Sequence, residues 1–486
     1  MKLLAVALLA LVVIFLIRER KHRKPAAASQ ALKSLPGAFS DIAVHTTDKS
    51  KKLVAGSPVK WQSRTEQADS ETVRILPAQT FQKIVGFGGA FTDSACFMFN
   101  QLDAEARSKL FTELFHPAQM ALNVNRTCIG SSDYATHMYS YDEGQPDPEL
   151  KRFSLDHDRK YILPMIREAR AINPDIFLFS SPWSPPGWMK ANGSMLGGNM
   201  RREYMPSYAH YFLKFLQGYE AEGVPVQAVT VQNEVDTDQD GRMPACAWPQ
   251  EYEVDFVRHH LGPLLRKEGQ DKKTQVWIID HNYNLWGRAL GSLDTEGLRD
   301  YASAIAWHGY VGDASRITTV HDAYPDVDMY WTEGGPDYTD PNYATDWTKW
   351  SRTFTGNLRN WCRAITVWNL ALDEAGRPNI GPFPCGGLVT INSTTREITR
   401  SGQFHAIAQY SRFIKRGAVR IGSESLGNYQ DLAHVAFVNP DGDYVLVLTN
   451  SGRARTVAIE LNGSYASLQL DGDSVTTVTW KPASVA

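Results

Sequence analysis

The sequence predicts an α/β protein, a (β/α)8 barrel of the TIM type with an attached antiparallel β-sandwich domain built from N- and C-terminal segments. Three observations predict this fold class. Short apolar runs alternate with amphipathic stretches from about residue 80 to 416, and strand-and-turn segments follow them. In addition, GFGGAF at 86–91 lacks the GxGxxG spacing of a doubly wound nucleotide-binding sheet, which is the alternative fold.

Eight short runs rich in branched or aromatic residues are the expected barrel strands, because strands buried on both faces are apolar throughout. They are Ile84–Phe87, Ala121–Cys128, Ile176–Ser180, Ala228–Val231, Val276–Ile279, Ala304–Trp307, Met329–Trp331 and Ala364–Trp368. Amphipathic helices separate several of these runs. One is expected to place Tyr208, Phe212 and Phe215 on one face at helical spacing.

The pattern changes after the last helix of this series, at about 404–414. Extended segments then follow one another at Leu432–Val438, Tyr444–Leu448, Val457–Leu461 and Val475–Trp480, with a turn sequence at Asn439–Gly442. We therefore assign residues 79–416 to the catalytic barrel and 417–486 to the C-terminal part of the sandwich. Residues 41–78 are expected to supply its N-terminal strand or strands.

The N-terminal segment, residues 1–24, contains an uncharged apolar run at 3–17 and then the basic block Arg18–Lys24. The run is shorter than the about 20 residues of a membrane-spanning helix and suits the core of a signal peptide. The basic block instead favours an uncleaved anchor. Both interpretations stay open: a secreted or periplasmic protein, or a membrane-anchored one that associates with the membrane through residues 3–17. Residues 25–40 resemble a linker.

Composition narrows the function classes. Fifty basic and 53 acidic side chains give a net charge of −3, which argues against a nucleic-acid partner. Five scattered cysteines without CxxC spacing signal neither a metal knuckle nor a disulfide framework. Since the His and Asp clusters also lack zinc-type spacing, we expect no metal and no cofactor. Thirteen Trp residues favour a sugar-binding cleft, although a large core is the simpler explanation.

Two glutamates at strand ends are the candidate catalytic residues. Glu234 follows the fourth run in Gln232-Asn233-Glu234, and Glu333 follows the seventh. Active sites of such barrels lie at the carboxyl ends of the strands. A pair of carboxyl groups there, one acting as an acid and the other ionised, performs glycoside hydrolysis. The alternative for each glutamate is a structural ion pair.

Other strand ends supply candidate substrate contacts and supporting residues. Expected substrate contacts are Asp133, Trp183, Asn233, Trp368 and Asp93, and expected supporting residues are Arg126, His308, Tyr310 and His281. An amide at Asn233 can bond the sugar 2-OH, and Arg126 can orient a carboxylate. Tyr310 and His308 can hydrogen-bond Glu333 and hold it ionised. The alternatives are core positions for the two Trp residues and a buried ion pair for Arg126.

The segments around these residues resemble glycoside hydrolase family 30, most closely its glucosylceramidase (acid β-glucosidase) branch. The motifs are GFGGAFTDSA, NRTCIGSSDYA, SPWSPPGWMK, VTVQNE, AWHGY, YWTEGG, VWNLALDEAGRPN and FHAIAQYSRFIKRGAVRI. The resemblance implies hydrolysis with retention of configuration, Glu234 as acid/base, Glu333 as nucleophile, and a β-glycoside substrate, either a glycolipid or an oligosaccharide. Two departures are Val235, where relatives often have proline, and GPFPCGG after Asn379.

Several alternatives remain at this point. Within the family they are a β-1,6-glucanase, a β-xylosidase and a glucuronoxylanase, the last of which needs a cation such as Arg377 to hold the glucuronate. A non-catalytic carbohydrate-binding or membrane-tethered scaffold protein would have lost at least one of the two glutamates. A barrel enzyme for phosphorylated sugars would need a phosphate-binding glycine turn, to which Gly334-Gly335 corresponds only weakly.

Overall fold

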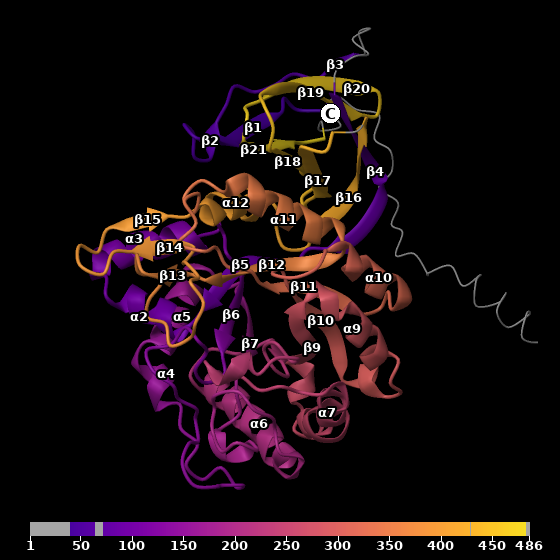
Figure 1. Ribbon diagram of the computed structural model, residues 1–486. Helices are drawn as coiled ribbons and strands as arrows, with labels where there is room; N and C mark the ends of the chain where they lie inside the picture. Colours follow the sequence, from indigo (N-terminus) through magenta and orange to yellow (C-terminus); the bar gives the residue numbers. More distant parts are fainter. Residues whose placement is uncertain (1–38, 64–70, 428, 483–486) are drawn as a thin grey trace, which may run out of the picture. The chain divides into compact units, whose positions relative to one another are not determined.

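The computed structural model describes residues 39–63, 71–427 and 429–482. The expected signal peptide or anchor, and nearly all of the expected linker, lie outside the described residues. Eight parallel strands close into a barrel in the order β10-β11-β12-β5-β6-β7-β8-β9 (Figure 1). A ten-stranded sheet forms the second part, so the predicted fold class is confirmed.

All eight predicted runs overlap barrel strands. The strands are β5 (Gly86–Phe91), β6 (Val124–Cys128), β7 (Phe177–Ser181), β8 (Ala228–Thr230), β9 (Gln275–Asn282), β10 (Ala302–His308), β11 (Asp328–Glu333) and β12 (Cys362–Asn369). The first strand starts and ends later than predicted. Its glycines lie inside the strand, because the next strand passes too close for a side chain. A Cβ atom at Gly88 would lie 1.9 Å from the carbonyl oxygen of Val124.

Helices connect the strands on the outside of the barrel. They are α2 (Asp93–Asn100), α3 (Ala104–Phe115), α4 (Asp156–Lys160), α5 (Ile162–Ile172), α6 (Met205–Ala221), α7 (Gln250–Phe256), α8 (Gly262–Lys267), α9 (Trp286–Leu293), α10 (Ser315–Ala323), α11 (Trp347–Arg359) and α12 (Gly402–Ser411). The longest, α6, buries Tyr208, Phe212 and Phe215 as predicted. A π-helical turn at Val257–Leu261 separates α7 from α8.

Side chains from the first halves of the strands fill the inside of the barrel and form a packed core. Trp277 and Tyr330 stack with their ring centroids 4.2 Å apart, and the small residues Ala304, Ala306 and Ala364 leave room for them. Large and small side chains therefore fill the space together, as is usual in such barrels. A pocket can consequently open only beyond this layer, at the carboxyl ends of the strands.

Both ends of the chain contribute to the ten-stranded sheet. β1 (Ala43–Thr47) pairs with β21 (Ser474–Trp480), and β4 (Glu71–Lys83) pairs with β16 (Val419–Leu426). The other strands are β2 (Val54–Ala55), β3 (Gln62–Ser63), β17 (Leu432–Val438), β18 (Tyr444–Asn450), β19 (Arg455–Leu461) and β20 (Ser464–Leu470). One pair, β4 with β19, is parallel. No hairpin joins these two strands, so nothing in their connection requires an antiparallel orientation.

The segment between β12 and α12 forms a small sheet of its own. It contains β13 (Ala371–Leu372), β14 (Val389–Ile391) and β15 (Ile398–Arg400). These strands could not be predicted from the sequence, because two or three residues are too few to show a periodicity. The sheet supports the loop that contains Phe383, Pro384 and Cys385.

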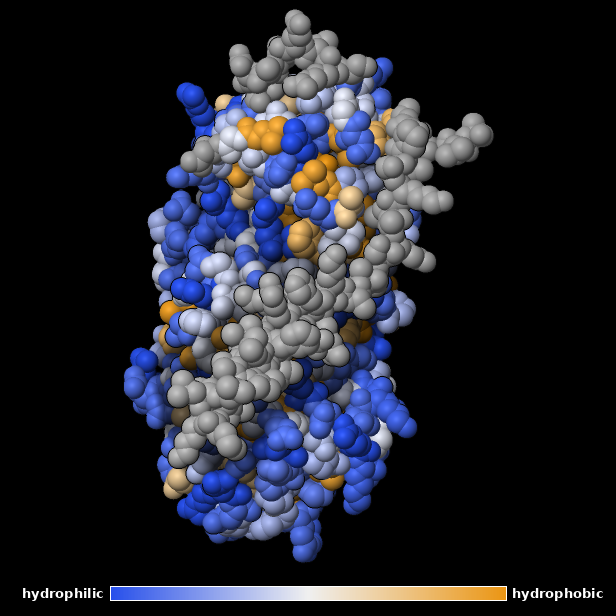
Figure 2. Space-filling model, turned by 90° about the vertical axis from the view of Figure 1, so that its right-hand side faces the viewer, coloured by the Kyte–Doolittle hydropathy of each residue, from blue (hydrophilic) through white to orange (hydrophobic). Residues whose placement is uncertain are grey.

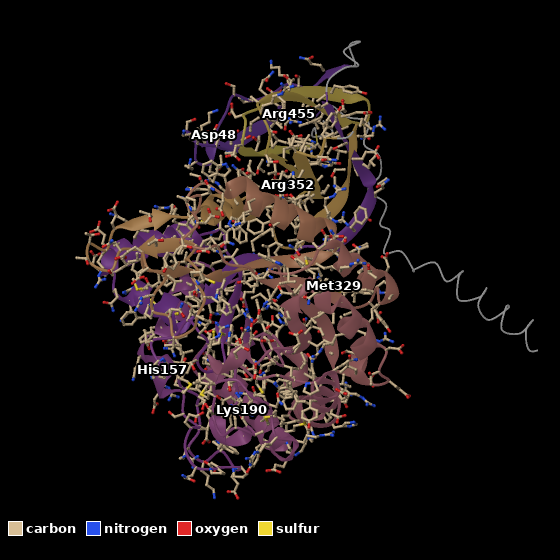
Figure 3. All side chains as sticks on the ribbon, in the orientation of Figure 1. Asp48, His157, Lys190, Met329, Arg352 and Arg455 are labelled. Carbon is tan, nitrogen blue, oxygen red and sulfur yellow. The ribbon has the colours of Figure 1, made fainter. Side chains whose placement is uncertain are left out.

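Helices α11 and α12 lie between the barrel and the sandwich strands (Figure 1). The Ser351 and Thr449 hydroxyl groups lie 2.6 Å apart, and the indole of Trp347 donates to the carbonyl of Asp473 at 2.8 Å. Arg352, labelled in Figure 3, donates from α11 to the carbonyl of Gln430 at 3.0 Å. Hydrogen bonds, both buried and exposed, therefore connect the two parts of the fold.

Hydrophilic residues cover most of the described surface on the face shown in Figure 2, and the hydrophobic patches there are small. In the described part of the chain, no helix is both long and apolar enough to cross a membrane. All five cysteines are free thiols.

Candidate active site

Irregularities at the carboxyl ends of three strands determine which side chains face the site. Three residues there have no partner in the pairing of neighbouring strands. They are Asp280 between β9 and β10, Thr332 between β10 and β11, and Trp368 between β12 and β5. Successive residues of a regular strand point to opposite faces. An extra residue changes this alternation and redirects side chains. Neighbouring residues such as Asp280 and His281 can therefore both serve the site.

A pocket of about 500 Å³ lies at these strand ends. Its wall contains eight of the eleven predicted site residues: Asp133, Trp183, Asn233, Glu234, His281, Tyr310, Glu333 and Trp368. The remaining lining residues are Thr237, Gln239, Met243, Asn282, Val311, Gly335, Pro336, Asp337, Phe383, Pro384 and Cys385. The pocket is thus built from side chains at the ends of many different strands, as in other barrel enzymes.

Glu333, at the end of β11, is held by two donors. Arg126 Nη1 donates to Oε2 at 2.5 Å, and the Tyr310 hydroxyl donates to Oε1 at 3.1 Å. Arg126 is fully buried on β6. Both donors favour the ionised carboxylate over the neutral acid. His308 was also expected to bond Glu333, but its Nε2 lies 3.9 Å away and only 3.0 Å from Asp280.

Glu234, after β8, has different neighbours. Gln239 Nε2 donates to Oε2 at 2.7 Å, while Oε1 lies 3.4 Å from the Nδ1 atoms of both His281 and His308. The backbone of Glu234 is in the left-handed region, with φ of 56°. A non-glycine residue there is strained, and such strain is frequent at functional sites. The surrounding hydrogen bonds keep this carboxyl group directed into the pocket.

Burial and charge shift the pKa values of these groups. Burial raises the pKa of Glu333, and the positive charges of His308 and Arg126 only partly oppose this effect. Burial also acts on Glu234, but His308 and His281 outweigh it, so its pKa lies below the ordinary value. Although burial disfavours its charged form, the surrounding carboxylates raise the pKa of His308 to about 9. Protonation of His308 therefore competes with any ligand that needs the lone pair of its Nδ1 atom.

Asp133 and the two indoles form the opposite wall. Trp183 and Trp368 stack with centroids 5.0 Å apart, and both rings lie near the Arg126 guanidinium. Asp133 is buried, and its Oδ1 has no hydrogen-bond partner among the described residues. Burial, and then Glu333 and Glu234, raise the pKa of Asp133 well above its ordinary value. An unpaired buried carboxyl group is costly unless a ligand completes its hydrogen bonds.

Asp93 does not line the pocket, although it was predicted as a substrate contact. Its carboxylate accepts hydrogen bonds from the Thr136 backbone at 2.6 Å and the Tyr161 hydroxyl at 2.7 Å, and His157 Nε2 lies at 2.6 Å. It thus connects the start of α2 to the loop after β6. Having these three partners, Asp93 is a structural support for that loop.

Asp280 is one of the site residues that were not predicted from the sequence. It is fully buried and interacts with Arg126 at 2.7 Å and His308 at 3.0 Å. The hydroxyl groups of Ser181, Thr230 and Thr332 also bond to it. Asp280 balances the positive charges of Arg126 and His308. Burial alone would raise the pKa of Asp280, but Arg126 and His308 hold it far below its ordinary value. Its position next to His281 at the end of the fifth predicted strand was the available signal.

A barrel with two carboxyl groups and stacked indoles in one pocket is the architecture of a glycoside hydrolase. The family models for the glycosyl hydrolase family 30 TIM-barrel domain and beta sandwich domain match residues 84–414 and 417–478. The chain belongs to glycoside hydrolase family 30. This confirms the resemblance seen in the sequence and shows that the protein is a family 30 glycoside hydrolase.

Individual relatives are similar over most of the chain. An endo-1,6-beta-D-glucanase of Neurospora crassa is 35% identical over 84% of this chain and 87% of its own length. The Caenorhabditis elegans protein named "Putative glucosylceramidase 4" is 29% identical over 90% of this chain and 88% of its own length. Among solved structures, an endo-beta1,6-glucanase is 29% identical with a TM-score of 0.83, covering 91% of this chain and 100% of its own.

Proposed function

We propose that this hydrolase cleaves β-1,6-linked glucan with retention of configuration, using Glu333 as the nucleophile and Glu234 as the acid/base. The support for the substrate is the similarity to endo-1,6-beta-D-glucanases from Neurospora crassa and Trichoderma harzianum, at 35% and 32% identity. The glucosylceramidase-like function, which the sequence placed first, has weaker support, since the relatives with that name are called putative and are 28–30% identical.

The observation that carries the proposal is the charge of the pocket wall. Four acidic residues line it, Asp133, Glu234, Glu333 and Asp337, and the described lining contains no Lys or Arg. Carboxylates bond well to sugar hydroxyls but repel an anionic substrate. Arg377, the expected contact for a glucuronate, is exposed and outside the lining. The pocket therefore suits a neutral glucan better than glucuronoxylan.

Retention is proposed from the resemblance to family 30, in which the two carboxyl groups of a retaining pair lie about 5–5.5 Å apart. The imidazole of His308 lies 3.4 Å from Glu234 with one nitrogen and 3.9 Å from Glu333 with the other, so one ring contacts both carboxyl groups.

In the first step, the Glu333 carboxylate attacks the anomeric carbon while protonated Glu234 donates its proton to the departing oxygen. Without substrate the pKa of Glu234 is lowered and that of Glu333 is raised, so these roles require Glu234 to gain a proton and Glu333 to lose one as substrate binds. Arg126 and Tyr310 keep Glu333 ionised and fix its orientation. The leaving oxygen of a β-1,6 linkage belongs to a primary alcohol, a poor leaving group, so proton donation by Glu234 is essential. A covalent glycosyl-enzyme results.

In the second step, Glu234 removes a proton from water, which attacks the anomeric carbon and frees Glu333. Asn233 supports both steps: its Oδ1 accepts from Arg126 at 2.9 Å, so its amide nitrogen remains to donate to the sugar 2-OH. Asp133, with its unpaired oxygen, is placed to bond other hydroxyls of the same ring. Trp183 and Trp368 provide apolar faces for it.

The test is a comparison of substrates. Linear β-1,6-glucan, glucosylceramide vesicles, glucuronoxylan and an aryl β-xyloside are incubated with the protein, and products are measured by chromatography and NMR. We expect β-1,6-linked oligosaccharides from the glucan, released first as the β-anomer. Preferential hydrolysis of glucosylceramide, or an initial α-anomer, would contradict the proposal.

A further inference from the structure

The acid/base Glu234 shares its position with two histidines from neighbouring strands. Ligand atoms of Glu234, His281 and His308 all lie within 4.8 Å of one another. Oε1 of Glu234 is 3.4 Å from Nδ1 of His281 and 3.4 Å from Nδ1 of His308. A tetrahedral ion with bonds of about 2.0–2.1 Å separates its ligands by about 3.4 Å. The two separations between Glu234 and the imidazoles therefore match the ligand spacing of a tetrahedral ion.

The far nitrogen of each imidazole is anchored to a carboxylate. Nε2 of His281 lies 2.6 Å from Asp236 Oδ1, and Nε2 of His308 lies 3.0 Å from Asp280 Oδ1. Metal-binding histidines nearly always have this second partner, which fixes the ring and its tautomer. Here both rings have it, and both direct Nδ1 toward the same oxygen of Glu234.

The neighbours of His281 show which nitrogen carries its lone pair. Asn282 Oδ1 accepts from the backbone nitrogen atoms of Tyr310 at 2.9 Å and Val311 at 3.1 Å. Its amide nitrogen is thereby turned toward Nδ1 of His281, at 3.3 Å. Since an amide nitrogen only donates, Nδ1 of His281 is the acceptor, and a lone pair on this atom is what a metal ion requires.

His308 supplies an independent observation. Its ring is fully buried, and among the described residues Nδ1 makes no hydrogen bond of regular geometry; its contact is Glu234 Oε1 at 3.4 Å. Buried polar atoms without a partner are rare and often mark a site for a ligand. The Glu234 carboxylate faces this atom, while its other oxygen is occupied by Gln239.

We propose that Glu234, His281 and His308 form a site for a divalent transition-metal ion such as Zn²⁺, and that the bound ion inhibits the hydrolase. Two imidazoles and a carboxylate suit Zn²⁺ rather than Mg²⁺ or Ca²⁺, which prefer oxygen ligands. The fourth position faces the pocket. The ion occupies the oxygen that must donate and accept the proton, so no glycosidic oxygen can be protonated while it is bound. This inhibition rests on the proposed role of Glu234, whereas the metal site itself does not.

The test uses the full, untagged chain without substrate. Zn²⁺ is titrated by calorimetry, and Co²⁺ by its visible absorption, because a tetrahedral site gives Co²⁺ strong bands that an octahedral hydrated ion lacks. We expect one equivalent to bind. Metal ions and protons compete for the same nitrogen atoms, so the titrations are made at a fixed, neutral to mildly alkaline pH.

Three variants locate the site. His281→Ala is expected to abolish the Co²⁺ bands, and Asp236→Asn to weaken Zn²⁺ binding by about 10–100-fold, the usual effect of losing such an outer partner. His259→Ala changes an exposed histidine in the π-helical turn Val257–Leu261, which does not line the pocket. It controls for surface binding and is expected to bind as the wild type does. Circular dichroism confirms that each variant is folded. If His281→Ala does not fold, Glu234→Gln replaces it, because an amide is a much poorer ligand than a carboxylate.

The outcomes separate the two proposals. Absence of stoichiometric binding, or wild-type binding by the folded His281→Ala or Glu234→Gln protein, would overturn the metal site even if the protein hydrolyses glucan. Binding at this site without any glycosidase activity would support the metal site and refute the proposed function. Binding without loss of glucan hydrolysis would overturn the inhibition. We expect inhibition by Zn²⁺ that substrate relieves and chelation reverses.

Discussion

Arg126 shows how one side chain organises the reacting groups. It contacts Glu333, Asn233 and Asp280, and its guanidinium lies 4.8 Å from the centre of the Trp183 ring. A buried cation requires such partners, because burial without them costs several kcal/mol. The same contacts fix the nucleophile, the expected 2-OH donor and one pocket wall relative to one another.

Replacing the acid/base tests its role. Glu234→Gln is expected to lower kcat/KM on β-1,6-glucan by about 10²–10⁴-fold, because the amide cannot protonate a poor leaving group. The first step on an aryl β-glucoside with an acidic phenol should lose much less, since such a phenol departs without a proton. The measurement is kcat/KM for both substrates. Equal losses would contradict the role, and Glu333→Gln is the control expected to inactivate toward both.

The pH profile tests the environment of Glu333. Its carboxyl group must be ionised to attack, and burial raises its pKa. As the pH is lowered, kcat/KM should therefore begin to fall at a higher pH than it would with a nucleophilic glutamate of ordinary pKa. Tyr310→Phe removes a donor to the ionised form. The pKa should then rise further and move the acidic limb upward by about 0.5–1 pH unit. An acidic limb that stays in place or moves downward would refute this account.

Individual site residues were predictable to different degrees. Glu234 and Glu333 follow apolar runs directly, so their place at the barrel opening could be read from the sequence. Asp93 also follows a strand, yet it supports a loop through His157 and Tyr161. Position after a strand predicts the edge of the barrel, whereas the partners of a side chain depend on loops whose course the sequence does not show.

At the scale of elements, the strand irregularities explain why Asp280 was missed. In a regular strand His281 and Asp280 would face opposite sides, so only one of them is expected in a site. The register between β9 and β10 skips Asp280, which has φ of 44°. A residue without a strand partner does not change the apolar pattern of a short run, so its altered orientation cannot be recognised from the sequence. The three metal-ligand candidates lie after β8, in β9 and in β10, which is why no zinc-type spacing appears in the sequence.

The end of β11 offers a test of local packing. A Cβ atom at Gly334 would lie 2.3 and 2.4 Å from ring carbons of the buried Trp331. Gly334→Ala is therefore expected to lower the free energy of unfolding by about 1–3 kcal/mol. Because Gly334 follows Glu333, activity should fall as well.

Gly356→Ala is the matched control for this substitution. Gly356 lies within α11, and a Cβ atom there would have no neighbour within 4 Å. The same change should raise the free energy of unfolding by up to about 1 kcal/mol, because alanine favours the helix. Denaturant unfolding measures both variants. Equal effects of the two substitutions would show that packing against Trp331 is not the cause.

At the scale of the whole molecule, the sequence revealed both parts of the fold and the participation of both chain ends in the sandwich. The predicted segment before the barrel corresponds to β1 and β4. In the ten-stranded sheet β1 pairs with β21, and β4 pairs with β16. The parallel pair of β4 with β19 was not foreseen. Long-range pairing depends on packing between distant segments, and alternation in either strand carries no information about its direction.

The connection between barrel and sandwich predicts a single unfolding transition. Buried hydrogen bonds join Ser351 to Thr449 and Gln409 to Thr47, and a partly buried one joins Trp347 to Asp473. Separating the two parts would leave these polar groups exposed or unpaired. Thermal unfolding followed by circular dichroism and by Trp fluorescence should therefore give coincident midpoints. Two resolved transitions would show that the sandwich unfolds independently.

Covalent trapping tests the central claim most directly. The protein is incubated with an activated 2-deoxy-2-fluoro-β-glucoside, which slows the second step more than the first, and the labelled peptide is identified by mass spectrometry. The account predicts a gain of one fluorinated sugar on the peptide that contains Glu333, and no gain in the Glu333→Gln protein. A label on Glu234 or on another residue would contradict the assignment of the nucleophile, and an unlabelled but hydrolytically active protein would contradict the covalent mechanism.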